Sequence, residues 1–235
     1  MSLQLLRQDL KKLSNPKKAK LLSRFFKSGK GENGEGDIFL GVTVPESRKI
    51  AIKYKSLSLE EVEDLLKSKI HEERLIALLL LVHNYQKHPE KRQEIYNFYL
   101  KSAKNNCINN WDLVDLSCHQ IVGEYLLDKD RAVLYKLASS SNLWEKRISI
   151  ISTAAFIRKN QFQDTIRISK LLIKDKYDLI HKAVGWMLRE VGKRDKEELI
   201  NFLNSHYKEM PRTMLRYSIE KLPEKQRKAY LKASF

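Results

Sequence analysis

The chain has 235 residues, of which 42% are hydrophobic and 31% charged, so it can bury a full core and is not composed like a disordered protein. The formal net charge is +16, which is typical of proteins that bind a polyanion. The longest apolar run, Leu75 to Val82, is far shorter than the roughly 20 residues that cross a bilayer. With no secretory segment found and with Cys107 and Cys118 expected to be reduced thiols, we expect a cytoplasmic protein without a membrane partner.

The basic residues are unevenly distributed. Residues 1–30 carry nine Lys and Arg against a single acid, and residues 131–194 carry fourteen against five. The acids gather instead between residues 60 and 73. A charged surface that is merely solvated is the alternative explanation of the net charge, but this distribution favours one basic face.

Signals that start helices recur along the chain. A proline in the first turn of a helix loses no hydrogen bond, and the prolines lie at Pro16, Pro45, Pro89, Pro211 and Pro223. Ser58 and Glu61 have the spacing of a capping box ahead of apolar residues at helical intervals. Alternation typical of a strand is confined to residues 38–44. Apart from residues 38–44, the chain is therefore predicted to be helical along almost its whole length.

Basic residues also lead into four apolar helical segments, at Arg74, Arg147, Lys182 and Arg212. Their intervals of 73, 35 and 30 residues fit a repeat near 35, a period typical of stacked helix pairs such as those of HEAT-like solenoids. We therefore predict an all-α fold with one HEAT-like repeat domain over residues 1–235. An irregular helical bundle is the alternative.

A glycine-rich segment interrupts the helices. Residues 28–41 (SGKGENGEGDIFLG) hold five of the eight glycines and include a Gly-x-Gly-x-x-Gly spacing. A dinucleotide site requires a strand before this motif and a helix directly after it, whereas here a helix precedes it and no parallel sheet is expected. The segment is predicted to be a flexible, partly basic loop, which either joins two helices or closes over the backbone of a ligand.

Signatures of several enzyme classes are absent from the sequence, among them Gly-x-Ser-x-Gly, His-Glu-x-x-His and the Walker-type Gly-Lys-Ser/Thr. Asp115 and His119 are four residues apart, but a third ligand at a plausible spacing is missing. We expect no metal and no cofactor. His71 and His181, near helix starts, are predicted to be structural or surface residues.

Four side chains stand out by type and position. Trp111 and Asp115 would share one helix face, Arg147 lies at the start of the next repeat's helix, and Trp186 lies within the helix after that. Each has an ordinary explanation, as a core aromatic or a surface charge. Trp144, between apolar neighbours, is predicted to be a core residue.

At these residues the chain resembles the AlkD-type DNA alkylation repair glycosylases, a family of HEAT-like solenoids. The similar strings are residues 111–115 (WDLVD), 144–147 (WEKR) and 181–190 (HKAVGWMLRE), within a likeness that runs from Asn15 to the C-terminal helices. The resemblance implies a right-handed superhelical solenoid with a concave basic face. It also implies that Trp111, Asp115, Arg147 and Trp186 are active-site residues and that Trp144 is not.

The activity that the resemblance implies is hydrolysis of the N-glycosidic bond of cationic N3- and N7-alkylated purines in duplex DNA, without extrusion of the base. Residue chemistry suits this activity. A carboxylate at Asp115 could stabilise an oxocarbenium-like sugar and position water, while Trp111 and Trp186 flank the sugar. Arg147 would hold a phosphate. The other expected DNA-binding residues are Arg189, Lys17, Lys18, Lys20, Arg24, Phe25 and Lys27.

The chain departs from the family pattern at Phe25, where relatives can carry a tyrosine, so a hydrogen bond at the cleft is in doubt. Two other functions remain open: a noncatalytic repeat protein that binds damaged or branched DNA, and a protein-binding scaffold. We expect a monomer, because a solenoid that grips one duplex needs no second copy.

Overall fold

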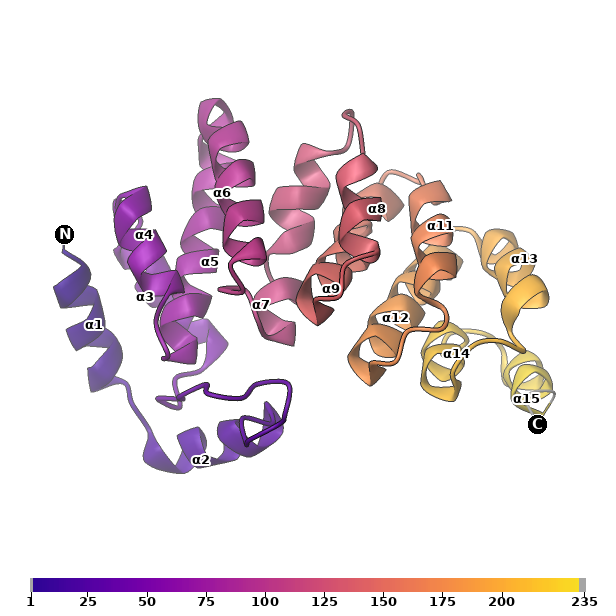
Figure 1. Ribbon diagram of the computed structural model, residues 1–235, viewed down its shortest axis with the longest axis horizontal. Coiled ribbons are helices and arrows are strands. Elements are labelled where there is room, and N and C mark those ends of the chain that lie inside the picture. Colours follow the sequence, from indigo (N-terminus) through magenta and orange to yellow (C-terminus); the bar gives the residue numbers. More distant parts are fainter. Residues whose placement is uncertain (1, 233–235) are drawn as a thin grey trace. The chain divides into compact units, whose positions relative to one another are not determined.

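The computed structural model describes residues 2–232, and the regular secondary structure within them is helical (Figure 1). Within those residues no strand forms, and the segment with strand-like alternation makes only one parallel bridge, between Ile38 and Ile70. The all-α prediction is thus confirmed. The strand-like alternation of residues 38–44 gives no strand, only this single bridge. None of the described helices is both long and apolar enough to span a membrane.

The chain divides into two compact units, with the boundary between Ser117 and Cys118. Each unit is a stack of packed helices, as a repeat array requires. The handedness of a superhelix, the concave basic face and the single domain over residues 1–235 remain predictions.

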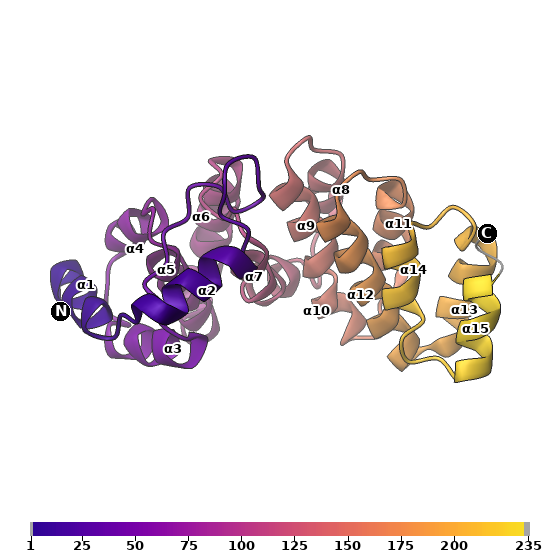
Figure 2. The ribbon, with the colours of Figure 1, turned by 90° about the horizontal axis from the view of Figure 1, so that it is seen from below.

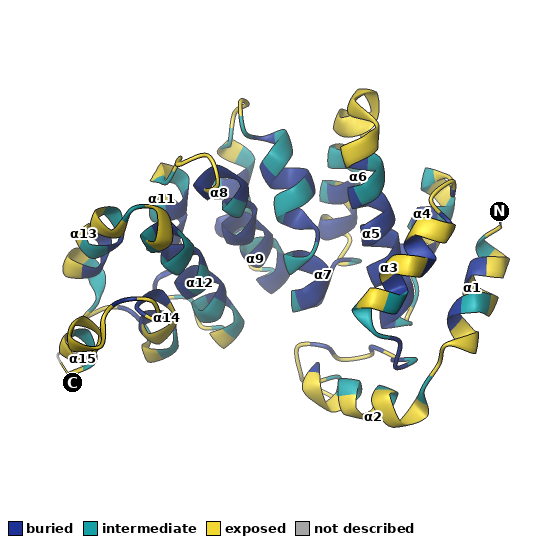
Figure 3. Ribbon diagram, turned by 180° about the vertical axis from the view of Figure 1, so that it is seen from behind, coloured by how far each residue is buried: buried dark blue, intermediate teal, exposed yellow. Residues whose placement is uncertain are grey.

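In the first unit, α5 is the central helix, and α3, α4, α6 and α7 all pack against it. Its buried stretch from Leu75 to Val82 explains why the run is apolar on every side, and Figure 3 shows α5 as almost wholly buried. The unit contains α1 (Leu3–Lys12), α2 (Pro16–Phe25), α3 (Val44–Lys53), α4 (Leu59–Leu66), α5 (His71–Lys87), the 3₁₀ helix η1 (Pro89–Lys91), α6 (Arg92–Lys104) and α7 (Trp111–Asp115).

In the second unit, α12 has the central place, in contact with α9, α11, α13 and α14. The neighbouring α9 also packs on α8 and on a π-helical turn, η2. The unit contains η2 (His119–Gly123), α8 (Ala132–Ala138), α9 (Leu143–Ser152), α10 (Ala154–Ile157), α11 (Gln163–Leu172), α12 (Asp178–Arg194), α13 (Lys196–His206), α14 (Arg212–Ser218) and α15 (Glu224–Lys232).

Helix starts follow the local signals in the sequence. The Asn15 side chain accepts a hydrogen bond from the Lys18 amide, with Pro16 in the first turn of α2. The capping box predicted at Ser58 and Glu61 is present at the start of α4. Pro89 differs from expectation, because it opens a single 3₁₀ turn and the α-helix itself begins at Arg92.

Helix α2 has no buried residue. It runs crosswise beneath the ends of the packed helices of the first unit (Figure 1, Figure 2), and its surface is mostly exposed (Figure 3). The residues at its C-terminal end hold it in place, since Phe26 directly after the helix is buried. An element that contributes so little to the core presents nearly all its side chains to solvent.

Candidate functional site

The site predicted in the first unit is built on α7, a helix of five residues. Asn110 precedes it with an extended backbone, and its side-chain oxygen accepts a hydrogen bond from the Trp111 amide at 2.8 Å. Leu113 and Val114 are fully buried, whereas Trp111 and Asp115 are half-buried. The prediction that Trp111 and Asp115 lie on one helix is therefore confirmed.

The Trp111 ring is held by two phenylalanines at the end of α2. It stacks on Phe26, with ring centroids 5.1 Å apart and planes 11° from parallel. Phe25 meets it edge-on at 5.8 Å and is 67% exposed. An exposed aromatic side chain beside a half-buried one forms an apolar surface at this end of the unit, on which a sugar or base could pack.

Beneath Trp111 lies a buried polar cluster that we call the His71 junction, formed by Asp37, His71, Arg74, Asn110 and Asp112. His71 Nδ1 lies 2.9 Å from an Asp37 oxygen, and Nε2 lies 2.8 Å from an Asp112 oxygen. Asp37 also accepts hydrogen bonds from Arg74 at 2.5 Å and from Asn110 at 3.0 Å. The junction thus links the glycine-rich loop, α5 and α7.

Electrostatics favour a charged imidazole in this junction. Burial alone would lower the pKa of His71, but the hydrogen bonds and charges of Asp112 and Asp37 outweigh it and raise that pKa to about 9. Burial likewise opposes ionisation of Asp37, yet the His71 and Arg74 hydrogen bonds and the Arg74 charge hold the pKa of Asp37 below its usual range. His71 is therefore an imidazolium near neutral pH, in contact with two carboxylates.

The glycine-rich loop is tethered at its second half. The buried Glu72 carboxylate accepts hydrogen bonds from the amides of Leu40, Gly41 and Val42, at 2.8–3.2 Å. Gly41 has a φ of +83°, and a Cβ there would lie 2.3 Å from the Asn15 carbonyl oxygen. Residues 37–42 of the segment predicted to be a flexible loop are therefore tethered by the buried Glu72 carboxylate and by the contacts of Asp37 in the His71 junction.

The five cations predicted to bind DNA near α2 are all exposed. They are Lys17, Lys18, Lys20, Arg24 and Lys27. Four of these cations make α2 a basic helix that also carries exposed apolar side chains such as Phe25, and Lys27 follows two residues after its end. Side chains of this kind can neutralise phosphates without first leaving a buried position.

In the second unit, Arg147 on α9 is only 5% exposed. One of its guanidinium nitrogens donates a hydrogen bond to the Leu179 carbonyl oxygen in the first turn of α12, at 2.5 Å. The neighbouring Lys146 pairs with Asp175, whose side chain is also buried. Arg147 is therefore fixed between α9 and α12. A phosphate-binding role for Arg147 remains a prediction. In such a role, the guanidinium would already be oriented by its hydrogen bond to the Leu179 carbonyl.

Trp186 and Arg189 lie on α12 close to two acids. The half-buried Trp186 donates its indole N–H to Glu190 at 3.2 Å, and Arg189 pairs with Glu190 and with Glu220 after α14. A cation that already has two carboxylate partners attracts a phosphate less strongly than a cation without such partners. The DNA-binding role predicted for Arg189 is untested and would require competition with these acids.

Trp144 and His119 also lie in the second unit. Trp144 is 6% exposed, so its predicted core position is confirmed. His119 is kept neutral, since burial and the neighbouring Arg158 lower its pKa to about 4. Among the described residues, no group of three or more His, Cys, Asp or Glu side chains is arranged to hold a metal ion.

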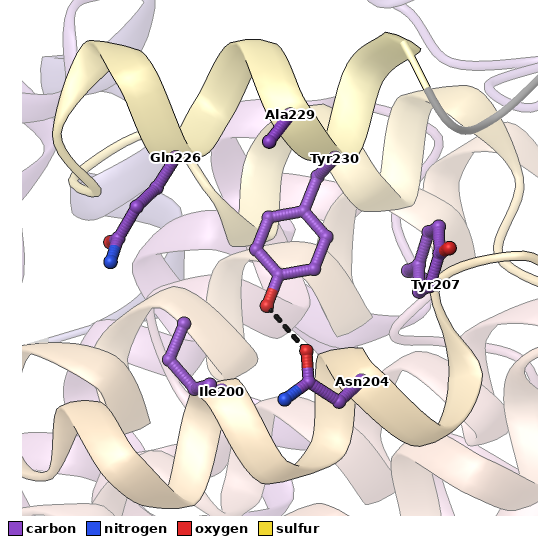
Figure 4. A pocket seen from close by; sticks show the side chains of 6 residues that line it. All are labelled: Ile200, Asn204, Tyr207, Gln226, Ala229 and Tyr230. Atoms are coloured by element: carbon purple, nitrogen blue, oxygen red, sulfur yellow. Dashed lines mark hydrogen bonds between the residues drawn. The ribbon is translucent and has the colours of Figure 1, made fainter.

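A groove between α13 and α15 has a volume of about 420 Å³ (Figure 4). The Tyr230 hydroxyl crosses it to donate a hydrogen bond to Asn204 at 2.8 Å. The groove is lined by Ile200, Asn204, Tyr207, Gln226, Ala229 and Tyr230. It holds neither a carboxylate nor a cation, so it lacks the chemistry expected of the predicted site.

Comparison with known families shows to which family the chain belongs. The family model described as DNA alkylation repair enzyme matches residues 6–222. This chain belongs to the DNA alkylation repair enzyme family. Its fold is similar to that of a solved structure described as a predicted DNA alkylation repair enzyme from Enterococcus faecalis, with a TM-score of 0.68 and 16% identity over 90% of this chain and 97% of the other. No curated protein sequence matches the chain.

For a DNA alkylation repair enzyme, the excess of cations has a clear partner, since DNA is the polyanion on which the family acts. Sequence reasoning missed the His71 junction, whose histidine is separated from its two carboxylates by 34 and 41 residues. Asp112, which lies in the first turn of α7, is buried against His71. The only available signal was a polar pair, Asn110 and Asp112, on either side of a tryptophan.

Proposed function

We propose that this DNA alkylation repair enzyme is a monofunctional DNA glycosylase. It hydrolyses the N-glycosidic bond of cationic N3- and N7-alkylated purines in duplex DNA, without base flipping, and acts as a monomer without a cofactor. The observation that carries the proposal is the pairing of an aromatic ring and a half-buried carboxylate, Trp111 and Asp115, on one short helix of a basic protein.

The chemistry requires little acid catalysis. Alkylation makes the purine cationic and hence a good leaving group, so the barrier lies in forming a positively charged, oxocarbenium-like sugar. A carboxylate about 4 Å from that charge attracts it by about 4 kcal/mol at an effective dielectric near 20. Asp115 supplies this attraction and orients the attacking water. Trp111 offers an electron-rich face to the sugar and excludes other water.

The roles of Arg147 and Trp186 complete the proposal. Arg147 holds a backbone phosphate of the lesion, with its guanidinium direction set by the bond to the Leu179 carbonyl. Trp186 provides the second aromatic face. The basic helix α2 binds the DNA backbone elsewhere, through the exposed cations from Lys17 to Lys27.

The test is excision from a duplex that contains one N7-methylguanine, with abasic sites cleaved by alkali. Asp115→Asn should lower the single-turnover rate by about a hundredfold, which is about 3 kcal/mol of barrier, and leave DNA affinity unchanged or improved. Asp128→Asn is the matched control, because it removes the same charge from an exposed position and should retain the wild-type rate.

Two results would remove the glycosylase proposal: no excision by the wild-type protein, or equal excision by wild type and Asp115→Asn. Tight binding of damaged duplex without turnover would favour the noncatalytic DNA-binding function instead. Weak DNA affinity with little dependence on salt would indicate a protein-binding scaffold.

A further inference from the structure

Both ring nitrogens of His71 are used within the first unit, and the side chain is only 2% exposed. Its Asp37 contact comes from the glycine-rich loop, and its Asp112 contact comes from α7. Both carboxylates are themselves buried. Removing one of these three side chains leaves another buried polar group without its hydrogen bond, which lowers the free energy of unfolding. The junction therefore fixes the distance between loop and helix.

The junction grips α7 on both sides of Trp111. Asn110 bonds the Trp111 amide with its oxygen and Asp37 with its nitrogen. One Asp112 oxygen accepts a hydrogen bond from the Leu113 amide at 2.8 Å. The other Asp112 oxygen bonds to His71 Nε2. The two residues that flank the tryptophan are thus held by the same cluster, which leaves the start of α7 little freedom to rotate.

The Trp111 ring is linked to His71 by a second route. Trp111 stacks on Phe26, and Phe26 lies 4.9 Å from the His71 ring. Phe39 stacks on His71 at 4.7 Å and on Phe26 at 5.0 Å. The imidazole is therefore in contact with aromatic faces above its plane while its edges bond to carboxylates. Ring packing and hydrogen bonding act on the same side chain.

We infer that His71 is a positioning residue, which through Asp112 and the Phe26 ring holds Trp111 and Asp115 in the orientation that glycosidic-bond cleavage requires. This inference rests on the proposed function for its catalytic consequence. Its structural content, the control of Trp111 by His71, stands independently. Apolar residues of the same volume could fill the core here without ionisable groups, and they would not define the rotation of α7.

Three of the elements around His71 contribute buried charges, while the segment that carries Phe26 contributes only the exposed cations Arg24 and Lys27. The loop contributes Asp37, α7 contributes Asp112, and α5 itself contributes Arg74, Glu72 and Glu73. Glu72 bonds to loop amides and Glu73 pairs with Arg7, so neither is bonded to the imidazole. Asp37 and Asp112 are balanced by Arg74 and the imidazolium. Loss of the His71 proton breaks this balance, so the positioning should weaken in alkaline solution.

The first experiment replaces His71 by glutamine and measures kcat and KM for the N7-methylguanine duplex. We expect kcat to fall between about 10-fold and 100-fold, as for small misplacements of catalytic groups, with KM changed by less than about threefold because α2 still binds the DNA backbone. His88→Gln, an exposed histidine after α5, should retain the wild-type kcat. An unchanged kcat in a folded His71→Gln protein overturns the inference.

The pH profile separates positioning from simple structural support. The wild-type kcat should fall above about pH 9, where the raised pKa of His71 places its deprotonation. Asp112→Asn removes one carboxylate and should move this alkaline limb to lower pH by about one unit or more. A limb at the same pH in both proteins contradicts the inference.

A third measurement needs no activity and so distinguishes this inference from the glycosylase proposal. In protein labelled with 5-fluorotryptophan, each of the three tryptophans gives a ¹⁹F resonance, assigned with single Trp→Phe variants. His71→Gln should shift and broaden the Trp111 resonance and leave those of Trp144 and Trp186 in place. If the wild type excises nothing but this shift is seen, the positioning holds and the glycosylase proposal fails. An unmoved Trp111 resonance overturns the positioning.

Discussion

Asp112 and Asp115 lie on the same five-residue helix but in different surroundings. Asp112 is buried and accepts hydrogen bonds from His71 and from the Leu113 amide. Asp115 is half-buried at the C-terminal end of the helix. Two carboxylates with different neighbours can therefore take separate roles. One orients the helix, and the other is proposed to face the substrate.

His71 should make stability depend on pH in alkaline solution. Its pKa is raised from 6.5 to about 9 on folding, so its contribution is complete below about pH 6.5 and is lost as pH rises through 9. The total is on the order of 3 kcal/mol. Urea unfolding at intervals from pH 6 to pH 10 should show this decline in wild type and a flatter curve for His71→Gln. Parallel curves would contradict the assignment.

At the scale of the elements, α7 is too short to be stable by itself. Its start is held by the His71 junction, and its end by Ser117, whose hydroxyl contacts the Leu113 carbonyl and the buried Tyr99 hydroxyl. The neighbouring α2 has the opposite character, since it is anchored at its end and exposed along its length. A short helix held at both ends, beside an exposed basic helix, suits the proposed site. In that proposal α7 carries the catalytic residues and α2 binds the DNA backbone.

Helix packing in the second unit depends on a glycine beside Trp186. A Cβ at Gly185 would lie 2.5 Å from the Tyr217 Cβ and 2.6 Å from the Met214 carbonyl oxygen, both on α14. Gly185→Ala must therefore push α12 and α14 apart, and should destabilise the protein by about 1–3 kcal/mol. Thermal and urea unfolding measure this loss.

The control for this variant is Asn201→Ala at an exposed position of α13, where stability should change by less than about 0.5 kcal/mol. Because Trp186 is adjacent, Gly185→Ala should also lower the excision rate. A Gly185→Ala protein as stable as wild type would show that α12 and α14 can separate without loss.

At the scale of the whole molecule, the net charge of +16 should make DNA binding strongly dependent on salt. The cations on α2 and Lys27 just after it are expected to account for much of this dependence. A variant with Lys17, Lys20 and Lys27 changed to glutamine should reduce the slope of log affinity against log salt by about 2 to 3, since each phosphate that a cation neutralises adds about 0.9 to the slope. Fluorescence anisotropy over a series of salt concentrations gives the slope.

The matched control removes the same number of charges from α6, at the exposed Lys101 and Lys104 and at the nearby Lys91. Its slope should stay close to that of wild type. Equal reductions in the two triple variants would mean that DNA responds to total charge and that α2 is not the binding element.

The helix starts and the family could be predicted from local stretches of sequence. Helix starts depend on neighbours within four residues, as at Asn15 and Ser58, so they are readable from a short stretch of chain. The strings around Trp111, Trp144 and Trp186 indicated the family without any structure. Where a local signal was weak, as at Pro89, the prediction missed by three residues.

The surroundings of the predicted site residues could not be predicted from the sequence, because they depend on contacts between distant segments of the chain. His71 meets its carboxylate partners across 34 and 41 residues of chain, and the burial of Arg147 depends on a contact with the Leu179 carbonyl 32 residues away. Nothing in the local sequence encodes such pairings, because they arise when separate helices pack and exclude water from the groups between them. For the same reason, a loop rich in glycine that reads as flexible is anchored by Glu72 from another element.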